Sequence, residues 1–115
     1  MIEDSGVREI AALLEDEYAH AFLIHTSTQA MSAAELSEAR DASISTIYRR
    51  IERLQEHDLL DEQLQPDRDG HHYRTYAARL ERVEIELVDG SFELEVTYHA
   101  ENAAARFTDL FEGLR

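Results

Sequence analysis

The chain has 115 residues, with 25 acidic and 11 basic side chains and a formal net charge of −14. All 11 basic residues are arginine, although lysine is normally among the commonest residues. An acidic chain without lysine indicates adaptation to concentrated salt, and it excludes heat adaptation, which enriches lysine together with glutamate. The absence of cysteine excludes disulfides, thiolate metal sites and sensing by thiol oxidation.

Length and hydropathy predict one soluble domain over residues 1–115. With 43% hydrophobic residues the chain has enough apolar side chains for a core. The first residues, Met1–Asp4, are acidic and no secretory apolar run follows them. The longest apolar stretch, Ala21–Ile24, is too short to cross a bilayer. We therefore expect a cytoplasmic location and no membrane partner.

Two helices are predicted in the N-terminal part of the chain. Ser5 is expected to cap the first helix, whose buried face repeats at i, i+3, i+4 and i+7. That face consists of Val7, Ile10, Ala11 and Leu14. Asp16 is expected to cap a second helix from Glu17 to about Thr26, which buries some of its large apolar residues. Those residues are Tyr18, Phe22, Leu23 and Ile24.

A short helix, a tight turn and an amphipathic helix follow. Ser32 and Glu35 have the spacing of a capping box, which predicts a helix to about Ala39. A turn over 40–42 leads to Ser43, the expected cap of a helix that ends near His57. Its predicted buried stripe is Ile44, Ile47, Ile51 and Leu54. Helix-turn-helix units use a turn of about this length.

After residue 58 the apolar period changes to two, which predicts strands. One strand is expected from Leu60 to Gln65 and a returning strand from His72 to about Ala78, joined by a turn over 66–70. A second hairpin is expected from Arg82–Val88 and Ser91–Tyr98, because Asp-Gly favours a two-residue turn.

The register of the second hairpin places glutamates opposite each other. Pairing Val88 with Ser91 sets apolar residues on one face and the pairs Glu86/Glu93 and Glu84/Glu95 on the other. The expected apolar face is Val83, Ile85, Leu87, Phe92, Leu94 and Val96. Facing like charges destabilise a hairpin, but molar salt shortens the screening length to about 3 Å and removes most of that cost.

A final helix is predicted from about Glu101 to Leu114. Its apolar stripe is either part of the core or a dimer interface, and so many large apolar residues on a terminal helix favour the dimer. The predicted dimer-interface residues are Phe107, Leu110, Phe111 and Leu114.

The polar face of the helix that begins after Ser43 has the composition of a DNA-recognition helix. Short hydroxyls lie near its start and arginines lie further along. Serine and threonine contact bases or phosphates, and arginine pairs with guanine or phosphate. The expected DNA-binding residues on this helix are Ser43, Ser45, Thr46, Tyr48, Arg49, Arg50 and Arg53.

The segments 32–38, 43–54 and 59–60 resemble the winged helix-turn-helix of ArsR- and PadR-like transcriptional regulators. The string S-T-I-Y-R-R-I-E-R-L within 43–54 is a specific match to that superfamily. Residues 67–74 resemble its wing, and the tail from 79 to 110 resembles the haloarchaeal members. The likeness departs at residues 40–41, where Arg-Asp stands instead of a glycine turn, and in the missing metal-sensing cysteines.

This resemblance implies an α+β fold, a winged helix-turn-helix with an additional C-terminal β-hairpin and a dimerisation helix. The parts would be N-terminal helices and helix-turn-helix over 1–60, a wing over 60–80, an acidic hairpin over 81–98 and a C-terminal helix over 99–115. It implies a homodimer that binds a pseudo-palindromic operator in double-stranded DNA. The wing residues implied to contact DNA are Arg68, His71 and Arg74.

Charge is distributed unevenly along the chain. Residues 40–82 hold eight arginines and nine acids, a net of −1, whereas the remaining residues hold three arginines and sixteen acids, a net of −13. At molar salt the distant acids scarcely repel DNA. No cofactor is expected. We hypothesise that K⁺ or other cations bind surface carboxylates such as Asp41, Glu52 and Glu56, and that their uptake on DNA binding flattens the usual loss of affinity with salt.

Other functions are less well supported by the sequence. Adjacent strand residues such as His71 and His72 point to opposite faces, so we expect no metal there. The phosphate-loop lysine, G-x-S-x-G and H-E-x-x-H are all absent, and no catalytic residues are expected. The alternative is an interaction module or nucleic-acid mimic that binds a basic protein, which the arginine-rich face of the 43–57 helix argues against.

Overall fold

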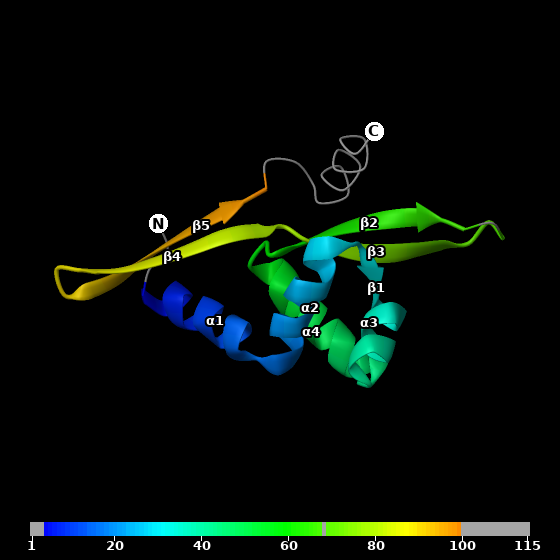
Figure 1. Ribbon diagram of the computed structural model, residues 1–115, viewed down its shortest axis with the longest axis horizontal. Helices are drawn as coiled ribbons and strands as arrows, with labels where there is room; N and C mark the ends of the chain where they lie inside the picture. Colours follow the sequence, from blue (N-terminus) through cyan, green and yellow to red (C-terminus); the bar gives the residue numbers. More distant parts are fainter. Residues whose placement is uncertain (1–3, 68, 100–115) are drawn as a thin grey trace.

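The computed structural model describes residues 4–67 and 69–99 and has an α+β fold. The described part contains four helices and two small antiparallel sheets. The helices are α1 (Asp4–Glu15), α2 (Glu17–Thr28), α3 (Ala33–Arg40) and α4 (Ile44–Glu56). The strands are β1 (Met31–Ser32), β2 (Leu60–Pro66), β3 (His72–Ala78), β4 (Leu80–Val88) and β5 (Ser91–Tyr98). Figure 1 shows the helices on one side of two hairpins that extend in opposite directions.

The helix starts follow from their capping side chains. The carboxylate of Asp16 accepts hydrogen bonds from the backbone N–H groups of Tyr18 and Ala19, which satisfies two of the free donors of α2. Ser32 and Glu35 form the reciprocal capping box of α3. These caps are confirmed. The first helix already includes Ser5, because α1 begins at Asp4, so the prediction of a Ser5 cap is wrong.

The β2–β3 hairpin joins the shortest strand, β1, in a three-stranded sheet of order β1-β3-β2. The register of β2 and β3 runs from Leu60 opposite Ala78 to Pro66 opposite His72. Strand β1, which has two residues and pairs Met31 with Tyr76, was not predicted. A strand this short has no detectable period, so only its pairing with β3 defines it.

The β4–β5 hairpin has the register that the sequence predicts. Val88 faces Ser91, Glu86 faces Glu93 and Glu84 faces Glu95. Asp89 and Gly90 both have positive φ, 49° and 85°, as a two-residue hairpin turn requires. Strand β4 begins two residues before the predicted Arg82, since Leu80 already pairs with Tyr98.

A single residue, Arg79, connects the two sheets. Its backbone N–H donates to the carbonyl of Leu59, and its own carbonyl accepts from the N–H of His99. Its guanidinium group lies 4.8 Å from the ring centroid of Tyr98, a favourable cation–π arrangement. The phenol of Tyr98 donates to the carbonyl of His57 at 3.3 Å. These contacts attach the β4–β5 hairpin to the C-terminal end of α4.

The core lies between the helices and the two hairpins. Phe22 of α2, Leu36 of α3, Leu54 of α4 and Leu94 of β5 are all almost fully buried. The predicted stripe of α4 is confirmed at Ile47, Ile51 and Leu54. It is wrong at the first position, because Ile44 is 48% exposed.

The N-terminal helices bury different residues from those predicted in two places. Helix α1 buries Leu13 and exposes Ala11, so its buried stripe lies at 7, 10 and 13–14. Helix α2 continues past Thr26 to Thr28, and its Ile24 is 55% exposed. Thr26 is fully buried, and its hydroxyl is satisfied there by donating to the carbonyl of Phe22 at 2.6 Å.

Candidate nucleic-acid interface

Helices α3 and α4 are held in place by a turn in which Asp41 replaces the usual glycine. Asp41 adopts φ 50° and ψ 49°, the left-handed conformation that ends many helices and that aspartate tolerates better than most residues. The N–H of Ala42 donates to the carbonyl of Ser37 at 3.1 Å. Arg40 and Asp41 therefore make a tight turn without a glycine.

The hydroxyl groups at the start of α4 form a local network. The Ser43 hydroxyl accepts from the backbone N–H of Thr46 at 3.3 Å and donates to the Thr46 hydroxyl at 2.9 Å. The Ser45 hydroxyl lies 3.3 Å from that of Ser43. Ser43 and Thr46 thus stabilise the first turn of α4. The side chains of Ser43 and Ser45 are both exposed.

One face of α4 is exposed along its whole length. Its members repeat at i, i+3 or i+4, i+7 or i+8 and i+11, so they form a single stripe. They are Ser45, Tyr48, Arg49, Glu52, Arg53 and Glu56. Within residues 4–67 and 69–99, no ion pair involves Arg49 or Arg53. Two guanidinium groups are therefore available on this face.

Arg50 is placed differently from the other two arginines of α4. Its Nε donates to the carboxylate of Asp16 at 2.9 Å, and both side chains are 27% exposed. The guanidinium group also lies 5.7 Å from the ring centroid of Tyr18. Arg50 thus ties α4 to the start of α2, a role that its position beside Arg49 in the sequence did not indicate.

The pKa of Asp16 is consistent with its ion pair to Arg50. Partial burial acts to raise the pKa of Asp16, but hydrogen bonds from Ala19, Arg50 and Tyr18 and the positive charge of Arg50 together lower the pKa below its ordinary value. The carboxylate is therefore more stable in the folded protein than in the unfolded chain. One side chain both caps α2 and pairs with α4.

The β2–β3 hairpin presents its own polar residues next to α4. His71, His72, Tyr73 and Arg74 are exposed, and Arg74 Nε lies 3.5 Å from a carboxylate oxygen of Glu62 on the neighbouring strand. Both partners are well exposed, so this pair contributes little to stability and leaves Arg74 able to change partners. Burial, followed by the neighbouring Glu62, raises the pKa of Tyr76 on the same strand.

A groove lies between the start of α3, the side of α4 and the β2–β3 hairpin. Its volume is about 610 Å³. The residues that line it are Ser32, Ala33, Ala34, Tyr48, Leu64, His72, Tyr73 and Arg74. Of the sequence-predicted DNA-binding residues it includes Tyr48 and Arg74. The sequence did not indicate Leu64 of β2 as part of this groove, although it shares a face of the hairpin with Arg74, which it pairs with.

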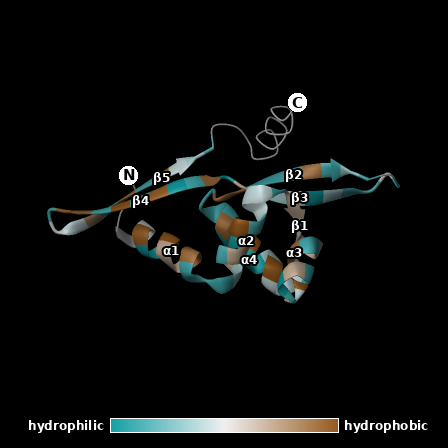
Figure 2. Ribbon diagram, viewed as in Figure 1, coloured by the Kyte–Doolittle hydropathy of each residue, from teal (hydrophilic) through white to brown (hydrophobic). Residues whose placement is uncertain are grey.

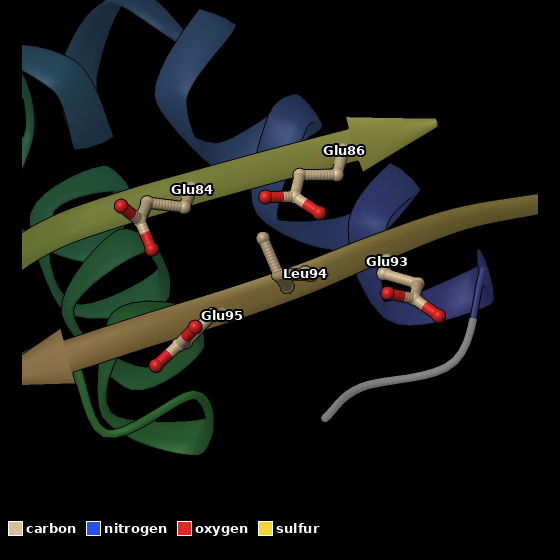
Figure 3. A pocket seen from close by; sticks show the side chains of 5 residues that line it. All are labelled: Glu84, Glu86, Glu93, Leu94 and Glu95. Carbon is tan, nitrogen blue, oxygen red and sulfur yellow. The ribbon is translucent and has the colours of Figure 1, made fainter. Parts of the chain in front are cut away.

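A second, smaller pocket is acidic. Glu84, Glu86, Glu93 and Glu95 line it together with Leu94, and its volume is about 300 Å³. Figure 3 shows the four carboxylates, which come from facing positions of β4 and β5. Arg82 forms an ion pair with Glu84 at its edge. The four carboxylates of this pocket repel a polyanion such as DNA.

Several predicted site residues lie outside the described part of the chain. Arg68, expected in the wing, is one of them, and so are the four predicted dimer residues Phe107, Leu110, Phe111 and Leu114. Within the described residues, no group of three or more histidine or acidic side chains is arranged to hold a metal ion. None of the described helices has the length and hydropathy needed to span a membrane. No protein-family model matches the chain, and no curated protein is significantly similar to it.

Proposed function

We propose that the chain is a sequence-specific DNA-binding transcriptional regulator that works as a homodimer at high salt. In this proposal α3, the turn and α4 are a helix-turn-helix, α4 is the recognition helix and the β2–β3 hairpin is the wing of a winged-helix fold. The observation that supports it best is the exposed stripe of α4, on which Arg49 and Arg53 have no ion-pair partner among the described residues.

The geometry of the stripe suits the major groove. Ser45 lies near the start of α4 and the two arginines lie one and two turns further along, so all three point to the same side. Arginine forms bidentate hydrogen bonds with guanine, each worth about 1–3 kcal/mol of discrimination. We exclude Arg50 from the base-reading set, because its guanidinium group pairs with Asp16.

The homodimer is supported by the free end of the β4–β5 hairpin. This end extends beyond α1, and Figure 2 shows apolar residues along β4 toward its turn. Ile85, Leu87 and Phe92 are 45%, 68% and 46% exposed there, whereas Leu94 further along the same face is buried under the helices. A second copy offers an identical apolar face, as an isologous interface requires.

Selection from a library of random DNA duplexes at 2 M KCl tests the function. The proposal predicts enrichment of a motif with two related half-sites whose centres lie about 34 Å, or one helical turn, apart. The alternative, a module that binds a basic protein, predicts that no sequence is enriched over the input. A parallel selection with Arg49→Ala controls for enrichment by the matrix.

A further inference from the structure

The side chain of Arg79 lies where the β4–β5 hairpin meets the C-terminal end of α4. Its guanidinium group lies 3.6 Å from the carboxylate of Asp58, which follows α4, and 3.9 Å from that of Asp61 on β2. It also lies 4.8 Å from the ring centroid of Tyr98 on β5. One side chain therefore contacts the end of α4 and both neighbouring sheets.

The hydroxyl of Tyr98 makes a second link at the same place. It donates to the carbonyl of His57 at 3.3 Å, and His57 is the C-terminal cap of α4. Hydrogen bonds and cation–π contacts depend on how the two groups are placed relative to each other. The contacts of Arg79 and Tyr98 therefore fix the angle between the β4–β5 hairpin and α4.

A small rotation at this junction moves the free end of the hairpin by a large distance. Strand β4 runs from Leu80 to Val88 and rises about 3.4 Å per residue, so Leu87 lies about 24 Å along it from Leu80. A tilt of about 10° at the base therefore displaces Leu87 by about 4 Å, while one base pair of DNA rises about 3.4 Å. In the proposed homodimer this end contacts the second copy. The angle at Arg79 then determines the distance between the two α4 helices to about one base pair.

The hairpin is also attached to the body through Leu94. This side chain of β5 is 1% exposed and packs in the core. Hydrophobic attraction is non-directional. Leu94 therefore keeps the hairpin on the body when the contacts of Arg79 are removed, but it allows the hairpin to tilt.

We propose that Arg79 is a positioning residue for DNA recognition, which holds the β4–β5 hairpin at the angle that sets the spacing of the two half-sites. Tyr98 shares this role through its ring and its hydroxyl. The inference rests on the proposed function and goes beyond it, because it assigns the half-site spacing to residues outside α4. The sequence of each half-site and the spacing between half-sites thus depend on different parts of the chain.

The test measures the affinity for duplexes that carry the selected half-site twice, at spacings on either side of one helical turn, by fluorescence anisotropy at 2 M KCl. For wild type, a shift of one base pair from the best spacing should weaken binding about tenfold, because a rigid dimer then engages only one half-site fully. In Arg79→Gln this factor should fall to about threefold or less, since the hairpin tilts to fit either spacing. Tyr98→Phe, which removes only the hydroxyl bond to His57, should give an intermediate factor.

Two controls separate positioning from a general loss of structure. The affinity for a duplex with a single half-site should be the same in wild type and in Arg79→Gln. Arg82→Gln is the matched control, because Arg82 pairs with Glu84 of its own strand. It should keep the wild-type dependence on spacing.

The outcomes also separate this inference from the proposed function. If wild type prefers one spacing and Arg79→Gln prefers it as strongly, Arg79 does not set the spacing and only this inference fails. An equal loss of affinity for the single and the paired half-sites contradicts it as well. If Arg79→Gln does not fold, a wild-type dependence on spacing in Tyr98→Phe overturns the inference. If wild type binds no duplex, the proposed function itself is wrong.

Discussion

The pair formed by Asp16 and Arg50 should stabilise the protein in two separable ways. Asp16→Asn keeps a side-chain oxygen for capping α2 but removes the charge, whereas Asp16→Ala removes both. A hydrogen bond between charged groups contributes about 1.5–3 kcal/mol when buried, and the two side chains here are 27% exposed, so we expect a loss of about 1 kcal/mol for Asp16→Asn. Loss of the cap adds about 1 kcal/mol, so Asp16→Ala should cost about 2 kcal/mol.

Urea unfolding at 2 M KCl measures these values. The cycle of Asp16→Asn, Arg50→Gln and the double variant should give a coupling energy of about 1 kcal/mol. A coupling energy near zero, or equal losses for Asp16→Asn and Asp16→Ala, would refute the assigned roles.

The same pair has a defined pH dependence. Because the pKa of Asp16 is lower in the folded protein than its ordinary value of 3.8, its contribution to stability is complete above that value and is lost as the pH falls through the folded pKa. Between pH 7 and pH 3, wild type should therefore lose more unfolding free energy than Asp16→Asn. Equal losses in the two proteins would contradict the lowered pKa.

Two further predictions concern the β4–β5 hairpin. Glu86→Gln removes the repulsion from Glu93 across the strands, so it should raise the unfolding free energy by about 0.5 kcal/mol at 0.1 M KCl and by almost nothing at 2 M. An equal gain at both salt concentrations in urea unfolding would show that charge repulsion is not the cause. Leu87→Ser and Phe92→Ser should shift the protein toward monomer in sedimentation equilibrium, whereas Ile24→Ser should not. If all three variants have the wild-type mass, the hairpin end is not the dimer interface.

Local sequence patterns were sufficient for most of the fold. Capping side chains act within three residues of the helix start, so Asp16, Ser32 and Ser43 could each be identified from the sequence. The Asp-Gly turn fixes the register of β4 and β5 through its own length, and the strand partners followed from it. These features depend on neighbours in the chain and need no knowledge of the tertiary structure.

The features that the sequence did not reveal depend on contacts between distant residues. Arg50 and Asp16 are 34 residues apart, and nothing in the α4 pattern separates Arg50 from Arg49. Ile44 continues the apolar stripe of α4 but is 48% exposed in the fold. The groove escaped prediction for the same reason, because Tyr48 and Leu64 line it together only when the β2–β3 hairpin lies beside α4.

The most direct test of the central claim is the affinity of the selected duplex for three arginine variants at 2 M KCl. Arg49→Ala and Arg53→Ala remove the two guanidinium groups of α4 that have no ion-pair partner within residues 4–67 and 69–99, and Arg8→Ala removes an exposed one from α1. We predict that each α4 variant weakens binding by at least about tenfold, with the preference for the selected sequence reduced, and that Arg8→Ala leaves both unchanged. Equal affinity of all three variants for the duplex would contradict recognition of DNA by α4.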